Sequence, residues 1–252
     1  MLLLLIALAK LSAMLPKRIL ILGGTSLARH AADVLVLAGC DVTSSLAGVT
    51  QNPMLPKGKV RVGGFGGVDG VRAYLEAEKI DLVIDATHPF AAKISANVVA
   101  AAGRAQVMRL SPPSWEKQSG DNWIDVFNIA EAVKKLPQGV RVAATVGRKE
   151  IEPFFVRSDL SGFARMIESP PVPVPPHWTL LQERPPFTVN QELKLFAEHQ
   201  IQYVVSKNAG GARAAKLDAA AQMNIPVVMI ARPFKPAVET FSKVEDLLGT
   251  FN

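Results

Sequence analysis

The chain has 252 residues, of which 49% are hydrophobic, so it can bury the core of one large domain or two smaller ones. Its one cysteine, Cys40, excludes an internal disulfide, and no Cys/His spacing resembles a zinc site; we expect no metal and a reducing, cytoplasmic location. The formal charge of +6 suits an anionic partner, but the 28 Lys and Arg residues form no basic stripe. This scatter disfavours nucleic acid and favours a small polyanion.

The first nine residues, MLLLLIALA, are wholly apolar. They are too few for a membrane-spanning helix and lack the positive charge that begins a signal peptide, so no membrane association is expected. Met14 stands just before the first strand. Residues 1–13 are therefore set apart as an N-terminal extension, either an over-extended translation start or a loose extra helix.

Short apolar runs that end in turn residues predict strands, and apolar residues at helical spacing predict helices. In chain order, the elements predicted in the first half are a strand at 17–22, a helix at 25–38, strands at 41–46 and 60–62, a helix at 68–79, a strand at 82–85, a helix at 91–102 and a strand at 106–110. This alternation predicts an α/β fold with a parallel, doubly wound sheet.

Prolines at 112 and 113 predict a domain boundary, with a first domain at 14–112 and a second at 113–252. The proline-rich segment 169–176 is expected to be an extended connection. The other segments predicted in the second half are a strand at 124–127, a helix at 130–136, a strand at 140–145, a further segment at 164–168, a helix at 189–199, a strand at 203–206, a helix at 212–223, a strand at 225–230 and a terminal helix at 238–248.

A candidate phosphate site follows the first predicted strand, where Gly23, Gly24, Thr25 and Ser26 lead into a helix. The N-terminus of a helix offers N–H groups and a positive dipole end to an anion. In the dinucleotide fingerprint G-x-G-x-x-G, Thr25 replaces the second glycine, and its hydroxyl can bond a phosphate. The alternative is a glycine turn with Thr/Ser caps that binds nothing.

The end of the second predicted strand lacks the acid that NAD-binding folds place there for the ribose hydroxyl. The residues at this place are Ser44, Ser45, Leu46, Ala47 and Gly48. Hydroxyl and backbone N–H groups tolerate a 2′-phosphate, which favours NADP over NAD. The alternative is a polar strand end without a ligand.

Four glycines occupy five positions in GGFGG, from Gly63 to Gly67. Such a cluster persists where positive φ or close backbone approach is needed. It indicates either a flexible linker or a bare backbone laid against a ligand.

The segment from Asp85 to Phe90, DATHPF, follows an apolar strand and so lies at the carboxyl end of a parallel sheet, where such sheets bind ligands. Thr87 or His88 can cap the next helix with Pro89 in its first turn, which explains the threonine and the proline without a ligand. His88 remains a candidate acid–base residue, with a structural histidine as the alternative.

Two strand-to-helix turns in the second half carry cations suited to carboxylates or phosphates. Solvated helix-start charges are the alternative, disfavoured because cations are unfavourable at helix N-termini unless an anion is present. The candidates are Arg148, Lys149, Lys207, Asn208, Gly210, Gly211 and Arg213.

Together, these segments resemble the precorrin-6A reductase family of the cobalamin pathway. The resemblance rests on ILILGGTSLAR at 19–29, SLAGVT at 45–50, VRVGGFGG at 60–67, DATHPFA at 85–91, VGRKE at 146–150, and SKNAGG, KLDAA and IPVVMIARP within 206–233. It implies an NADPH-dependent enzyme with two Rossmann-like domains and a cleft between them for the macrocycle. The reaction it implies reduces one ring double bond of precorrin-6A to give precorrin-6B. Val49 stands where many relatives are expected to carry an arginine, and close relatives act on a cobalt-containing substrate.

The resemblance also implies roles for the candidate residues. The cofactor contacts are Gly23, Gly24, Thr25, Ser26, Ser44, Ser45, Leu46, Ala47, Gly48, Gly64, Phe65, Gly66, Thr87, His88 and Pro89. The contacts to the substrate carboxylates are Arg148, Lys149, Lys207, Asn208, Gly210, Gly211 and Arg213. The electrophilic macrocycle needs no metal, and a proton comes from His88, Lys207 or solvent.

Two other functions fit the same residues. One is a non-catalytic NADP-binding redox sensor, and the other is an NADP-dependent reductase of a different anionic substrate. The sequence makes no prediction of oligomeric state.

Overall fold

The computed structural model describes residues 15–48 and 54–251. The chain divides into two compact units, a first unit of Met1–Pro113 with Pro233–Asn252 and a second unit of Ser114–Arg232. The N-terminal extension and Val49 lie outside the described residues. No helix in the described ranges is both long enough and apolar enough to cross a lipid bilayer.

The first unit is built on a six-stranded parallel sheet with the order β12-β5-β4-β1-β2-β3. Its strands are β1 (Arg18–Leu22), β2 (Asp41–Leu46), β3 (Lys59–Val62), β4 (Leu82–Asp85), β5 (Gln106–Leu110) and β12 (Glu239–Phe241). The order reverses between β1 and β4, which is the switch point of a Rossmann sheet. Ligands bind such sheets beside the carboxyl ends of the strands at this point.

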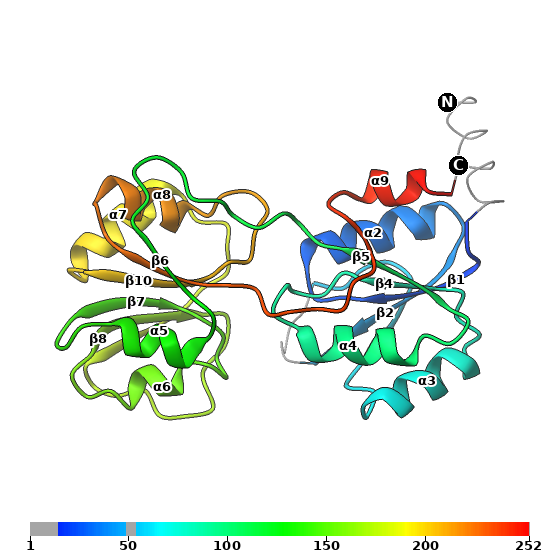
Figure 1. Ribbon diagram of the computed structural model, residues 1–252, viewed down its shortest axis with the longest axis horizontal. Coiled ribbons are helices and arrows are strands. Elements are labelled where there is room, and N and C mark those ends of the chain that lie inside the picture. The colour runs from blue at the N-terminus through cyan, green and yellow to red at the C-terminus, as the bar shows by residue number, and fades with distance from the viewer. Residues whose placement is uncertain (1–14, 49–53, 252) are drawn as a thin grey trace. The chain divides into compact units, whose positions relative to one another are not determined.

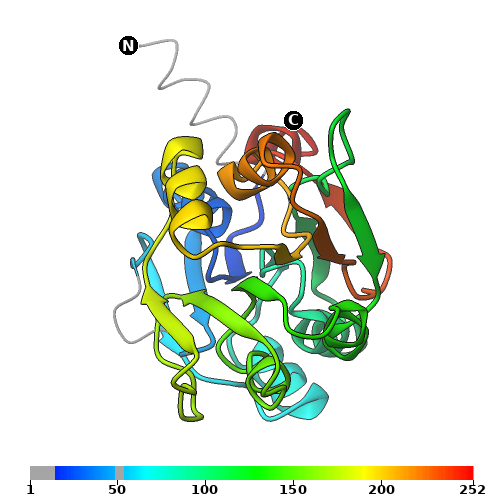
Figure 2. The ribbon, with the colours of Figure 1, turned by 90° about the vertical axis from the view of Figure 1, so that its left-hand side faces the viewer.

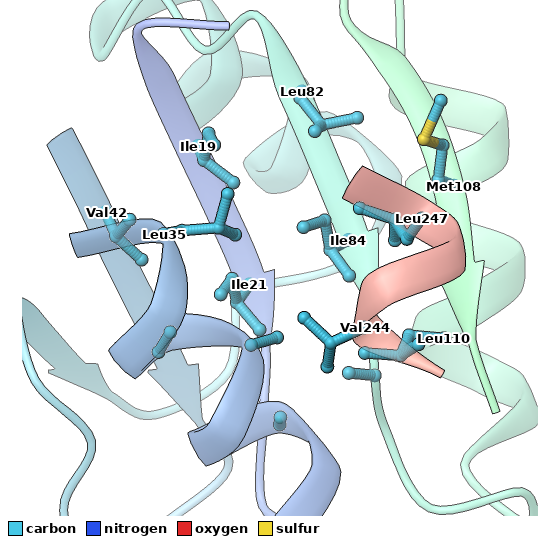
Figure 3. Close-up of a cluster of buried hydrophobic side chains, with 14 of the residues drawn as sticks. Ile19, Ile21, Leu35, Val42, Leu82, Ile84, Met108, Leu110, Val244 and Leu247 are labelled. Carbon is cyan, nitrogen blue, oxygen red and sulfur yellow. The ribbon is translucent and has the colours of Figure 1, made fainter. Parts of the chain in front are cut away.

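Helices cover both faces of this sheet (Figure 1). They are α2 (Ser26–Leu37), α3 (Val68–Ala77), α4 (Ala92–Ala101) and α9 (Val244–Gly249). Alternate residues of β1 serve the two faces: Ile19 and Ile21 pack with α2 and α9, and Leu20 and Leu22 pack with α3 and α4. A strand buried on both faces reads as a continuous apolar run, which is why RILIL was recognisable in the sequence. Figure 3 shows the α2–α9 side of this core.

The second unit repeats the architecture with a six-stranded parallel sheet of order β6-β11-β10-β7-β8-β9. Its strands are β6 (Trp123–Val126), β7 (Arg141–Thr145), β8 (Ser161–Met166), β9 (Trp178–Gln182), β10 (Tyr203–Lys207) and β11 (Val227–Ile230). The order reverses between β7 and β10. The predicted α/β fold with two parallel, Rossmann-like sheets is therefore confirmed.

The helices of the second unit are α5 (Ile129–Lys135), α6 (Glu152–Phe155), α7 (Val189–Glu198) and α8 (Ala215–Gln222). Figure 2 shows α7 and α8 on one face of the sheet, with α5 and α6 on the other. Phe196 of α7 and Leu217 of α8 are fully buried against Phe163 of β8 and Val204 of β10.

The last 20 residues differ from the prediction, which placed all of 113–252 in the second domain. Pro233–Asn252 belongs to the first unit. Residues 239–241, predicted to be helical, form β12 and pair with β5, from Glu239 opposite Met108 to Phe241 opposite Leu110. Val244 and Leu247 of α9 then bury their side chains in the first unit's core (Figure 3). The carboxyl-terminal segment thus supplies the sixth strand of the first sheet.

Candidate active site

The turn between β1 and α2 lies at the switch point of the first sheet. The Gly23 N–H donates to Ser45 O at 2.9 Å, so this amide joins the turn to β2. The Thr25 hydroxyl accepts from Ala28 N at 3.0 Å and donates to Ala86 O at 2.9 Å. Of the two roles that the sequence left open for this hydroxyl, the structure shows the helix cap. The backbone N–H groups of Gly24 and Ser26 lie at the start of α2, where the sequence predicted a phosphate site.

The glycine loop follows β3 at the same edge of the sheet. Gly63, Gly66 and Gly67 adopt φ values of 114°, 82° and 97°, which other residues rarely adopt. Gly64 has no such φ, and a Cβ built on it would meet no described atom within 4 Å. Neither backbone conformation nor packing within the described chain therefore accounts for glycine at position 64. Glycine at this position fits the second of the two interpretations of the loop, a bare backbone against which a ligand can lie.

The aromatic residue of this loop, Phe65, packs within the first unit. Its ring meets Tyr74 edge-on at 5.3 Å, and the Arg61 guanidinium lies 3.7 Å from the ring centroid. A Cβ on Gly70 would come within 1.6 Å of Phe65 O, so α3 approaches the loop closely here. Arg61 was not among the predicted site residues; the signal for it is a cation at the end of a strand beside a glycine cluster.

Asp85 closes β4 as a buried carboxylate that hydroxyl groups and cations surround. It accepts hydrogen bonds from Thr87 Oγ1 at 2.6 Å and Arg109 Nε at 3.1 Å, and Lys235 Nζ lies 3.8 Å away. Burial alone would raise the pKa of Asp85, but the Thr87 bond, the Lys235 charge and bonds from Ser95 and Arg109 outweigh it and lower the pKa. Lys235 was not among the predicted site residues, because it reaches this edge from the returning carboxyl-terminal segment.

The segment after Asp85 does not cap a helix as the sequence allowed. Helix α4 begins at Ala92 after the N-cap Ala91, which makes no side-chain cap bond. Thr87 and Pro89 are buried, whereas the His88 side chain is exposed. His88 Nδ1 accepts from Phe90 N at 3.3 Å, so a neutral imidazole carries its proton on Nε2.

The cationic turns of the second unit lie at its own switch point, and acids of the chain accompany them. Lys207 Nζ donates to both carboxylate oxygens of Glu150, at 2.9 and 2.7 Å. Arg148 Nη1 lies 3.4 Å from Glu168 Oε2, and Lys149 is exposed. From the sequence, we expected a bound anion to offset these charges. Part of that charge is instead offset by Glu150 and Glu168.

Two predicted substrate contacts have structural partners. Arg213 bonds Asp121 and Asp218, each at 2.5 Å, which ties the segment before β6 to α8. Asn208 Oδ1 accepts from Trp115 N at 2.8 Å, and its Nδ2 donates to Trp115 O at 2.9 Å. Both side chains therefore hold the turn in place.

The glycines of this turn, Gly210 and Gly211, adopt φ values of 75° and 80°. Arg232 holds the same turn through bonds to Asn208 O at 2.9 Å and Ala209 O at 2.8 Å.

Lys216, in the first turn of α8, is a further group at this edge. Its Nζ donates to Thr145 Oγ1 at 2.6 Å, and that hydroxyl donates to Val205 O at 2.8 Å. Desolvation, with a smaller effect from Arg165, lowers the pKa of Lys216 to about 8, although Glu192 opposes the shift. A lysine with such a pKa exchanges protons near neutral pH.

A cavity of about 650 Å³ lies elsewhere in the first unit. It is lined by Lys17, Arg18, Lys79, Ile80, Asp81, Arg104 and Gln106. These residues lie at the amino ends of β1, β4 and β5, away from the ligand-binding edge. Across the described ranges, no group of three or more His, Cys, Asp or Glu side chains is arranged to hold a metal ion.

The carboxyl edge of the first sheet thus gathers a helix start, hydroxyls, a bare glycine loop and a histidine. A family model described as precorrin-6x reductase CbiJ/CobK matches residues 18–252. A precorrin-6A reductase of Rhodococcus erythropolis is 44% identical over 238 residues, which cover 92% of this chain and 95% of that protein. One of Rhodobacter capsulatus is 40% identical over 237 residues, which cover 92% and 94%.

A solved structure described as CobK precorrin-6A reductase has a TM-score of 0.86 and 39% identity, and the match covers 93% of this chain and 95% of that one. The likeness extends over both units, and the family model covers the chain from β1 to its end. The chain therefore belongs to the precorrin-6x reductase CbiJ/CobK family.

Proposed function

We propose that this chain reduces precorrin-6A with NADPH, bound along the carboxyl ends of the strands of the first sheet. As a member of its family, the chain is an oxidoreductase of cobalamin biosynthesis that acts on a carbon–carbon double bond of precorrin-6A. The observation that carries the placement of the cofactor is the open, bare backbone at Gly64. The single cysteine, Cys40, supports a cytoplasmic site for the reaction.

The residues of the first unit fit a reduced dinucleotide. The start of α2, at Gly24 to Ser26, offers backbone N–H groups to the pyrophosphate. The end of β2, at Ser45 to Gly48, has no acid and suits the phosphorylated ribose. The glycine loop and Thr87 to Pro89 receive the nicotinamide end. When bound there, NADPH supplies the hydride that adds to one carbon of the substrate double bond.

The second unit holds the carboxylates of the substrate through Arg148, Lys149 and Lys207. Glu150 and Glu168 position two of these cations without neutralising the whole turn, because Lys149 remains exposed beside them. Binding through several fixed cations orients a rigid macrocycle, and orientation is the main contribution required of the protein in a hydride transfer.

The second carbon of the double bond receives a proton, so that one hydride and one proton add across it. The proposed donors are His88, which is exposed at the edge of the first sheet, and Lys207, which Glu150 holds in place. Neither role requires a metal or a covalent bond to the protein.

The direct test is to mix the full chain with NADPH and precorrin-6A without oxygen. We expect loss of the absorbance of the reduced nicotinamide and a product that has gained two hydrogens. A parallel sample with the cobalt-containing macrocycle compares the rates of NADPH oxidation with the two substrates. Oxidation of NADPH by a smaller polycarboxylate but not by precorrin-6A would contradict the proposed substrate. Oxidation of NADH but not of NADPH in the presence of precorrin-6A would contradict the proposed cofactor.

A further inference from the structure

Arg61 lies where the second and third strands of the first sheet end. It is paired in register with Ser45 of β2. Its Nη1 donates to Ser45 Oγ at 2.6 Å and to Gly63 O at 3.2 Å, and its Nη2 donates to Gly64 O at 3.2 Å. The guanidinium therefore joins the Ser45–Gly48 segment to the glycine loop.

Arg61 differs from Arg148 and Lys207 of the second unit in its ion pairing. Each of those two lies beside a glutamate, whereas no described carboxylate lies within ion-pair distance of Arg61. Lys59, two residues earlier on the same strand, is paired with Asp41 at 2.9 Å. Aromatic rings fix the Arg61 guanidinium instead, with the Phe65 centroid at 3.7 Å and the Tyr74 centroid at 5.1 Å. The half-buried guanidinium is thus held in place without a described carboxylate beside it, which leaves it able to pair with an anion.

The three bonds also determine which part of the guanidinium remains for a ligand. Two of them come from Nη1 and one comes from Nη2. Nε makes no hydrogen bond within the described part of the chain, and Nη2 makes one of the two that it can donate. Nε and Nη2 lie on one edge of the planar group, and such an edge can bind two phosphate oxygens in parallel. Ser45 Oγ accepts from Arg61, which leaves its own hydrogen for a third oxygen.

In a Rossmann sheet, the end of the second strand contacts the ribose of the adenosine. An acid at this place accepts from the 2′-hydroxyl of NAD, whereas a nearby arginine accommodates the 2′-phosphate of NADP. We infer that Arg61 and Ser45 bind the 2′-phosphate of NADPH, and that Arg61 determines the preference for NADPH over NADH. This inference rests on the proposed function, since it requires a dinucleotide at the carboxyl edge of the first sheet.

The test measures the dissociation constants of NADPH and NADH for the full-length parent, R61A and R61K by titration. We expect R61A to weaken NADPH binding by about 10- to 100-fold and to change NADH binding by less than about threefold. R61K keeps the charge but loses the paired N–H groups. Its NADPH affinity should therefore lie between those of the parent and R61A. Thermal unfolding of each variant establishes that it is folded.

K59A is the matched control, since it removes a cation from the same strand. We expect it to keep the parent's ratio of NADPH to NADH affinity within about threefold. If R61A weakens both cofactors equally, Arg61 only supports the glycine loop and the inference is wrong. If K59A reduces the ratio as much as R61A, the preference comes from overall charge and the inference is also wrong. A parent that binds NADH as tightly as NADPH would instead overturn the proposed cofactor.

Discussion

His88 is a proposed proton donor, and substitution of this residue tests that role. It is exposed at the carboxyl edge of the first sheet, and a backbone N–H fixes its Nδ1. If it delivers the proton, H88A should lower turnover by about 10²- to 10⁴-fold while NADPH affinity stays within about threefold. Titration with NADPH and single-turnover rates separate these effects. Loss of NADPH affinity in H88A would place the imidazole against the cofactor instead.

Lys216 makes the stability of the second unit depend on pH in a defined direction. Its pKa falls from 10.5 to about 8 on folding, so the unfolded chain holds more protons between these values. The contribution of this group to stability therefore rises as pH increases from 8 to 10.5.

K216M removes this contribution, so the stability of the parent relative to K216M should increase across that range. All three tryptophans, Trp115, Trp123 and Trp178, belong to the second unit, so their fluorescence during denaturation reports its unfolding alone. A difference between parent and variant that stays flat over this range would show that Lys216 is well solvated in the folded protein.

At the scale of elements, the proposed position of the cofactor depends on the glycine loop after β3. A Cβ added at Gly64 meets no described atom within 4 Å, so G64A should fold with about the parent's thermal stability. Its side chain would occupy space that the ligand uses, and we expect NADPH affinity or turnover to fall by about 10- to 100-fold.

Gly249 in α9 gives a matched control, because its Cβ would also meet nothing and its φ is not positive. G249A should bind and turn over like the parent. If G64A also behaved like the parent, the loop would be a linker and its glycines would need another explanation.

The elements that sequence reasoning found are those with strong local signals. Strand β4, buried at every position, reads as a continuous apolar run. Strand β12 has three residues and exists because β5, more than a hundred residues earlier, offers it an edge. Helix α6 is a single short turn, and β9 follows a proline-rich segment, so neither has a clear periodicity.

The site was predictable to the extent that it follows from strand ends. Parallel strands bring their carboxyl ends to one edge, so strand position, together with residue type and the family resemblance, made Gly24, Ser45, Gly64 and His88 candidates. The pairing of side chains was not predictable, because Arg213 meets Asp121 across 92 residues of sequence. Arg213, which the sequence predicted to bind the substrate, thus forms ion pairs that stabilise the fold.

At the scale of the whole molecule, each sheet is completed at one edge by a strand that is distant in sequence from the strand with which it pairs. Strand β6 precedes β7 in the chain yet takes the far edge of the second sheet, and β12 takes the far edge of the first. The chain therefore crosses between the units twice, near residues 113 and 233. As a consequence, Lys235 reaches Asp85 and Thr87 at the candidate site from the carboxyl-terminal segment.

The central claim is that NADPH binds the carboxyl edge of the first sheet, and amide hydrogen exchange of the full chain with and without saturating NADPH tests it most directly. We predict slower exchange in peptides covering the start of α2, the glycine loop and residues 86–91. The cationic cavity at the amino ends of β1, β4 and β5 provides the contrasting site within the same unit. Protection confined to residues 79–81 and 104–106, with no change at the glycine loop, would contradict the account.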